Sequence, residues 1–286
     1  MSASKVVSPA ILLRISKDIL ADDLMIPVIP EIALRVRKIA DHNDSGISDL
    51  AKVVKTDPSL SAYVVSVANS SLYARATKAN DVLDALSSIG SDNAANLAMT
   101  YSLRSLFTTK NKRIDQCMRK LWQHSTYLAS IASILASKTK SACPERALLA
   151  GLLQDIGSLP MVIKLEKYPE IIEDESLLDQ SLEKYSSQIG VRILQHWGFD
   201  EEMTEAVRTR EDWQRDTPGK MDLSDLILIA RLHSFMGTER IKALPTLDQL
   251  PAFSKLKNNE LTPDSSLVIL SQAKEEIDAL HLTFGQ

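Results

Sequence analysis

Helix start and stop signals recur along this chain, and they restrict its fold more than any other feature. The clearest is Asp57-Pro58, an N-cap carboxylate followed by a proline whose fixed φ suits the first helical position. Apolar residues then follow at three- and four-residue spacing: Leu60, Val64 and Val67. Asp81 starts a similar pattern, and Gly90 ends it in the usual C-terminal role. This spacing predicts a series of short amphipathic α-helices.

Composition agrees with an all-α fold class. The 286 residues include 9 glycines and 5% aromatic residues, which argues against a fold rich in β-turns and strands. Hydrophobic residues make up 44% of the chain and charged residues 24%, as in ordinary globular proteins. Residues 245–263 carry three prolines and are predicted to be irregular. The length suffices for two packed helical subdomains with a substantial core.

Charge and cysteine usage restrict the partners and the compartment. The net charge of −4 provides no overall attraction for nucleic acid or an anionic membrane, so neither is predicted as a partner. Cys117 and Cys143 lack CxxC spacing and are interpreted as free thiols in a reducing compartment. The first nine residues lack the apolar run of a signal peptide, and the apolar stretch 226–232 contains Arg231. These features predict a cytoplasmic protein.

Three segments carry a resemblance to a known family. They are residues 29–34 (IPEIAL), residues 57–60 (DPSL) continuing to 67–73 (VANSSLY), and residues 148–157 (LLAGLLQDIG). The first two resemble HDOD domains, the HD-related output domains of bacterial signalling proteins, and the third is similar to the Gly-Leu-Leu-His-Asp-Ile-Gly signature of HD-fold phosphohydrolases. The residues of this signature that could form a partner surface are Pro30, Glu31, Asp57, Pro58, Asn69, Ser70 and Tyr73. For Asn69 and Ser70, a helix-ending turn bonded to local backbone is the alternative.

The resemblance implies a metal site that this sequence has mostly lost. HD-fold hydrolases hold a divalent cation with one His, an adjacent His-Asp pair and a distant Asp, a set that activates water and polarises a phosphoryl oxygen. Matched position by position, the first His is His124, the pair is Gln154 and Asp155, and the distant Asp is Arg231. A guanidinium at that fourth position repels a cation. No catalytic residue, metal or cofactor is therefore predicted.

Further histidines of active relatives would fall near Ser186 and near Arg210-Glu211, where this sequence has none. A buried Asp155 without a metal would be an uncompensated charge. We therefore expect Asp155 to pair with Arg231, with His124 nearby, as a structural substitute for the cation. The alternative for His124 is an ordinary helix histidine with a satisfied ring.

These observations together predict three parts of the chain and one function. The parts are a partly ordered N-terminal extension at residues 1–18, a helical HDOD subdomain at 19–112, and an HD-like subdomain with a C-terminal helix at 113–286. The function that the resemblance implies is a non-catalytic bacterial signal-transduction module that acts through contact with other signalling proteins. Two alternatives stay open: a nucleotide-binding pseudoenzyme, and a residual metal-dependent phosphohydrolase.

Overall fold

The computed structural model describes residues 26–40, 46–70, 73 and 78–257, together with positions 271, 274, 275, 277 and 278. All regular elements among these residues are α-helices or short 3-10 helices, and the described ranges contain no β-strand. The predicted all-α fold class is confirmed. The predicted extension at residues 1–18 and most of the predicted C-terminal helix lie outside the described residues.

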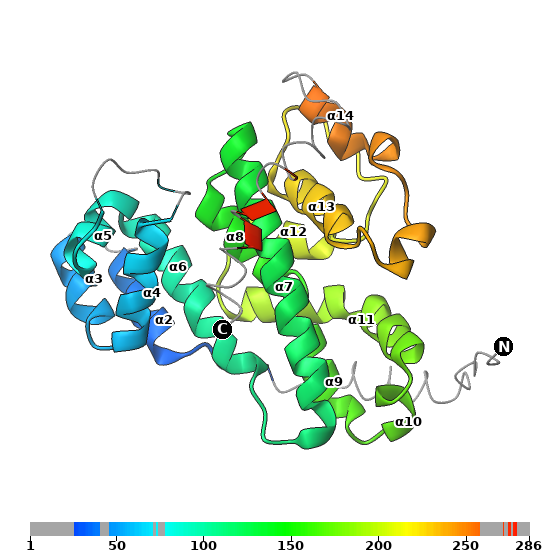
Figure 1. Ribbon diagram of the computed structural model, residues 1–286. Coiled ribbons are helices and arrows are strands. Elements are labelled where there is room, and N and C mark those ends of the chain that lie inside the picture. The colour runs from blue at the N-terminus through cyan, green and yellow to red at the C-terminus, as the bar shows by residue number, and fades with distance from the viewer. Residues whose placement is uncertain are drawn as a thin grey trace.

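The first group of helices lies on one side of the molecule (Figure 1). It comprises α2 (Glu31–Ala40), α3 (Ile47–Val54), α4 (Pro58–Ala68), α5 (Val82–Ile89) and α6 (Ser91–Leu103), followed by the 3-10 helix η1 (Arg104–Phe107). The sequence signals act as expected here. Asp57 accepts hydrogen bonds from the backbone N–H groups of Ser59 and Leu60, and Asp81 caps α5 through the N–H of Asp84. Gly90 ends α5 with φ of 86°, a conformation that favours glycine.

The second group of helices is built around α7, the longest helix of the structure, at Lys112–Thr139 (Figure 1). Its other α-helices are α8 (Pro144–Leu153), α9 (Ser158–Leu165), α10 (Pro169–Ile172), α11 (Glu175–His196), α12 (Glu201–Arg208), α13 (Leu223–Ser234) and α14 (Pro251–Lys257). Two 3-10 helices, η2 (Glu239–Ala243) and η3 (Leu247–Gln249), precede α14. The prediction that residues 245–263 are irregular is therefore wrong in part, because Pro251 occupies the first position of α14, which proline tolerates.

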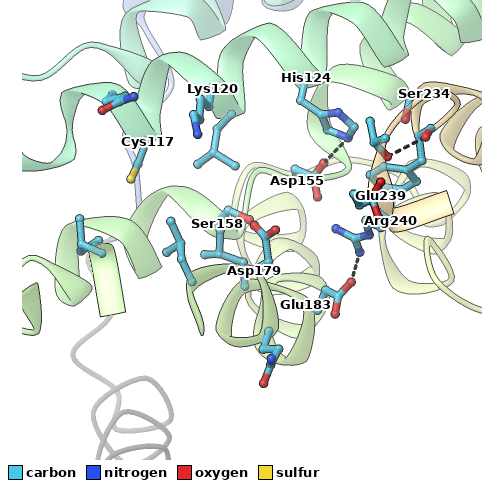
Figure 2. Close-up of a pocket in the computed structure, with 18 of the residues that line it drawn as sticks. Cys117, Lys120, His124, Asp155, Ser158, Asp179, Glu183, Ser234, Glu239 and Arg240 are labelled. Atoms are coloured by element: carbon cyan, nitrogen blue, oxygen red, sulfur yellow. Dashed lines mark hydrogen bonds and ion pairs between the residues drawn. The ribbon is translucent and has the colours of Figure 1, made fainter. Parts of the chain in front are cut away.

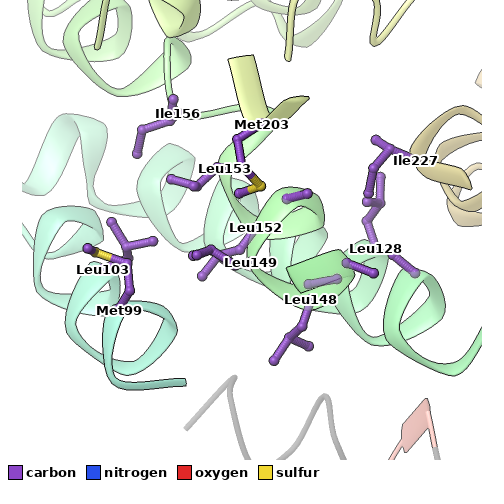
Figure 3. Close-up of a cluster of buried hydrophobic side chains, with 14 of the residues drawn as sticks. Met99, Leu103, Leu128, Leu148, Leu149, Leu152, Leu153, Ile156, Met203 and Ile227 are labelled. Carbon is purple, nitrogen blue, oxygen red and sulfur yellow. The ribbon is translucent and has the colours of Figure 1, made fainter. Parts of the chain in front are cut away.

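The helix α8 lies at the centre of the core. Its leucines pack against α6, α7, α12 and α13 through residues that include Met99, Leu128, Met203 and Ile227 (Figure 3). A Cβ atom on Gly151 would lie 2.7 Å from the Cα of Ala129, so only glycine permits this approach of α8 to α7. Residues Pro144–Leu165 are long and apolar enough to cross a membrane, but 89% of the most apolar 18-residue window in that stretch is buried inside the fold. It is a core segment.

Polar contacts join the two groups of helices. Arg37 of α2 donates hydrogen bonds to the carbonyls of Trp197 and Gly198, just after α11. Tyr73 donates to Glu145, on the first turn of α8. The chain passes from one group to the other between η1 and α7, next to the predicted boundary at 112/113. Whether residues 19–112 and 113–286 are separate domains stays a prediction.

Candidate functional site

The C-terminal end of α8 carries two polar side chains into the interior. Gln154 is the C-cap of α8 and Asp155 follows it, and both are buried. The central position of α8 places this helix end between α7 and α13. These two helices contribute His124 and Arg231, so three distant parts of the chain meet at Asp155.

The expected pair of Asp155 and Arg231 is present. Nη1 of Arg231 lies 3.2 Å from Oδ2 and 3.4 Å from Oδ1 of Asp155, and Nε2 of His124 lies 3.9 Å from Oδ2. Both side chains are nearly inaccessible, with 2% of Arg231 and 6% of Asp155 exposed. Charge-assisted hydrogen bonds are strong in a buried environment from which water is excluded. If either Asp155 or Arg231 were removed, the other would lose this charged partner.

A second arginine also binds Asp155, and the sequence reasoning did not assign it. Nη1 of Arg210 donates a short hydrogen bond to Oδ1 of Asp155, and only 2% of Arg210 is exposed. Arg210 follows the end of α12, at the window where active relatives were expected to carry a His-His pair. That alignment was the available signal, because it marked residues 210 and 211 as neighbours of the site.

Arg231 and Glu211 complete the network. Arg231 donates from Nη1 to the amide oxygen of Gln154 at 2.9 Å and from Nη2 to Oε1 of Glu211 at 2.9 Å. The same oxygen of Glu211 lies 3.1 Å from Nη2 of Arg210. One carboxylate thus neutralises part of the charge that two buried guanidinium groups place beside Asp155.

The arginines make the surroundings of His124 electropositive. Burial, followed by the charges of Arg231, Arg240 and Arg210, lowers the pKa of His124 to about 3, so its ring is neutral at pH 7. The ring stacks on Phe235, with centroids 5.2 Å apart. Burial and the charges of Arg231 and Arg240 also lower the pKa of Arg210 to about 9, although Glu211 opposes this.

The side chains present do not fit a divalent metal. Both oxygens of Asp155 face guanidinium groups, and the amide oxygen of Gln154 already accepts from Arg231. Across the described part of the chain, no cluster of three or more His, Cys, Asp or Glu side chains could hold a metal ion. Ser186, at another expected histidine position, is buried and shares a 2.8 Å hydrogen bond with Ser158.

The signature residues of the first helical group lie apart from Asp155 and bond within the chain. Asn69 donates to the carbonyl of Ala79 at 3.0 Å and accepts from its N–H at 2.7 Å, while Ser70 donates to the carbonyl of Val67. Pro30 precedes α2 and its carbonyl accepts from the N–H of Ala33, and Glu31 is exposed in the first turn. These bonds agree with the alternative of a local structural role. A partner surface at these residues stays a prediction, and Ser71 and Leu72 lie outside the described residues.

A pocket of about 1190 Å³ opens beside Asp155. Figure 2 shows Cys117, Lys120 and His124 of α7 along one side, with Asp179 and Glu183 of α11 across from them. Arg240 of η2 lies at the end where His124 and Asp155 meet, and its guanidinium pairs with Glu183 (Figure 2). The site is therefore an arginine-rich cluster with an adjoining pocket whose walls carry both signs of charge.

The all-helical architecture is that of an HD-related fold. The chain belongs to the HDOD domain family, whose model matches residues 26–213, more than half of its length. No curated protein sequence matches the chain.

Solved structures share the fold. A "putative metal-dependent phosphohydrolase" from Shewanella amazonensis SB2B is 24% identical, with a TM-score of 0.79 over 96% of this chain and 98% of its own. An HDOD domain protein from Geobacter sulfurreducens is 20% identical, with a TM-score of 0.65 over 96% and 98%. A "putative signal transduction protein" from Marinobacter aquaeolei VT8 is 27% identical, with a TM-score of 0.61 over 92% of this chain and 60% of its own.

Proposed function

We propose that this chain is a non-catalytic regulatory module of bacterial signal transduction, in which arginine side chains have replaced the metal of the HD site. One observation carries the proposal: the carboxylate of Asp155 is bound by the guanidinium groups of Arg210 and Arg231, where a hydrolase would hold a cation. Membership of the HDOD family and the similarity to the Marinobacter aquaeolei protein support the regulatory role.

The chemistry of the cluster argues against hydrolysis. A metal-dependent phosphohydrolase needs a cation that lowers the pKa of bound water and polarises a phosphoryl oxygen. Two fixed positive charges in contact with Asp155 oppose the entry of a further cation. His124 is held 3.9 Å from Asp155 as a neutral ring, and in this cluster it acts as a packing residue on Phe235.

The output that we propose is contact with another signalling protein in the cytoplasm. A helical module whose metal site is filled by arginines is expected to form no catalytic product, so we propose that it regulates by binding. The expected partner is itself a signalling or regulatory protein, and no cofactor is required.

Phosphodiesterase assays test the absence of catalysis. Wild-type protein and Asp155→Asn are compared with bis-p-nitrophenyl phosphate in Mn²⁺, Fe²⁺, Zn²⁺ and Mg²⁺. We expect the same background rate for both, because Asp155 serves no metal. A rate with any metal that clearly exceeds background and disappears in Asp155→Asn would replace the proposal with the phosphohydrolase alternative.

A further inference from the structure

Three guanidinium groups that line the pocket converge on one carboxylate. Oε1 of Glu211 lies 3.1 Å from Nη2 of Arg210, 2.9 Å from Nη2 of Arg231 and 3.7 Å from Nη2 of Arg240. Such a convergence of planar, multi-donor groups is how proteins hold carboxylates and phosphates. An internal carboxylate thus already occupies a place suited to an anion.

The three arginines differ in access. Arg210 and Arg231 are buried, whereas 26% of the Arg240 side chain is exposed to the pocket. Arg240 belongs to η2, and its guanidinium lies 4.3 Å from the centroid of Phe235. This stacking fixes the plane of the guanidinium, whose Nη2 lies beside the carboxylates of Glu183 and Glu211.

The present partner of Arg240 is a replaceable carboxylate. Glu183 of α11 accepts a short hydrogen bond from Nη2 of Arg240, and 41% of its side chain is exposed. An exposed ion pair of this kind contributes little to stability, because water solvates both groups when they separate. A ligand oxygen can therefore exchange with Glu183 at small cost.

The walls of the pocket carry both signs of charge, with Asp179 and Glu239 among them, and three of its arginines lie near His124. The carboxylates Asp155, Glu183 and Glu211 equal Arg210, Arg231 and Arg240 in number, so each arginine of the cluster has a carboxylate beside it. Burial, followed by the charges of these three arginines, lowers the pKa of His124.

We propose that the pocket binds a phosphate-bearing small molecule, whose phosphate takes the place of the Glu183 carboxylate on Arg240. The pocket volume of about 1190 Å³ leaves room for an organic group beyond the phosphate. The inference rests on the proposed function in one respect: the ligand is sensed and not hydrolysed. When the ligand binds, Arg240 of η2 no longer pairs with Glu183 of α11. Ligand binding therefore changes the contact between η2 and α11.

The two partners of one ion pair should then respond in opposite directions. Inorganic phosphate is titrated into the full chain by isothermal calorimetry, with sodium chloride matching the ionic strength. Arg240→Gln should weaken phosphate binding by about tenfold or more, because a charge-assisted contact is lost. Glu183→Gln should tighten it several-fold, because the competing carboxylate is gone. Lys242→Gln, which removes an exposed charge on the same 3-10 helix, should bind as wild type does.

The outcomes separate the inference from its rivals. Absence of saturable phosphate binding in both wild type and Glu183→Gln would overturn it. Equal weakening by Arg240→Gln and Glu183→Gln would also overturn it, because that is the behaviour of a purely structural ion pair. Weakening by Lys242→Gln equal to that of Arg240→Gln would show nonspecific attraction instead. Turnover of an organic phosphate would contradict the proposed function while leaving the binding site intact, so the two failures are distinguishable.

Discussion

Asp155 and Arg231 are 76 residues apart in the chain and meet at 3.2 Å in the interior, with Arg210 on the other carboxylate oxygen. The three side chains join the end of α8 to α13 and to the segment after α12. Ion pairs thus connect α8 to α13 and to the end of α12. An HD hydrolase would hold its metal at this position.

Removal of the carboxylate should destabilise the fold strongly. Asp155→Ala removes one of the two carboxylates that the buried Arg210 and Arg231 share, and we expect the free energy of unfolding to fall by about 3 kcal/mol or more. Urea denaturation measures the change. Lys52→Ala, which breaks an exposed ion pair with Asp49, is the control and should change stability by about 0.5 kcal/mol or less. An Asp155→Ala variant as stable as wild type would refute the structural role of the cluster.

Arg210 should be coupled energetically to Asp155. In a double-mutant cycle of Asp155→Ala and Arg210→Ala, we expect the double variant to lose less stability than the sum of the single losses. The coupling should be about 1–3 kcal/mol, as for residues in one buried network. Additive losses would mean that the contact between Arg210 and Asp155 contributes nothing to folding.

A glycine of the HD-like signature should be irreplaceable for steric reasons. A Cβ atom on Gly157 would lie 2.0 Å from the backbone oxygen of Ser186, and backbone atoms cannot move aside easily. Gly157→Ala should therefore lower stability by about 3 kcal/mol or prevent folding. Gly46→Ala is the control, because its nearest neighbour lies 4.0 Å away, and it should cost less than about 1 kcal/mol. Equal effects of the two substitutions in thermal unfolding would contradict the close approach of α9 to α11.

Stability should fall on acidification through two histidines. Burial, with three arginines in the case of His124, lowers the pKa of His124 to about 3 and that of His233 to about 4, from the usual 6.5. Between pH 6.5 and about 4 the unfolded chain therefore binds protons that the folded chain does not, so the free energy of unfolding decreases as pH falls. Above pH 7 neither histidine contributes to the pH dependence.

The measurement is the slope of stability against pH from urea denaturation between pH 4 and 7. His233→Gln and His124→Gln should each reduce that slope, by up to about 1.4 kcal/mol per pH unit for one group. Slopes unchanged from wild type in both variants would show that the two rings become protonated equally in the folded and unfolded states.

The local parts of this fold could be predicted because their signals are local. The caps at Asp57 and Asp81 and the helix stop at Gly90 act through backbone groups within three residues of each, so spacing alone reveals them. The start of α14 was missed because Pro251, read as a helix breaker, is instead its first residue. The contacts of α14 with α13 and η3 are tertiary, so the sequence pattern around Pro251 does not reveal them.

The site could be predicted only in part. Family resemblance aligned His124, Gln154, Asp155 and Arg231, and electrostatics then required a cation for Asp155. Arg210 was not assigned to the site from the sequence because it lies in a charged stretch that resembles solvent-exposed sequence. Its burial depends on how α12 ends against α8. The exchangeable pair of Arg240 and Glu183 links residues 57 positions apart and has no sequence signal of its own.

Metal content is the most direct measure of whether arginine has replaced the cation. Wild type and Asp155→Asn are purified without chelator, supplied with Mn, Fe, Zn and Mg, desalted and subjected to elemental analysis. We predict that both hold far less than one equivalent of every metal. A stoichiometric metal in wild type that Asp155→Asn loses would contradict the arginine-filled site and restore the phosphohydrolase interpretation.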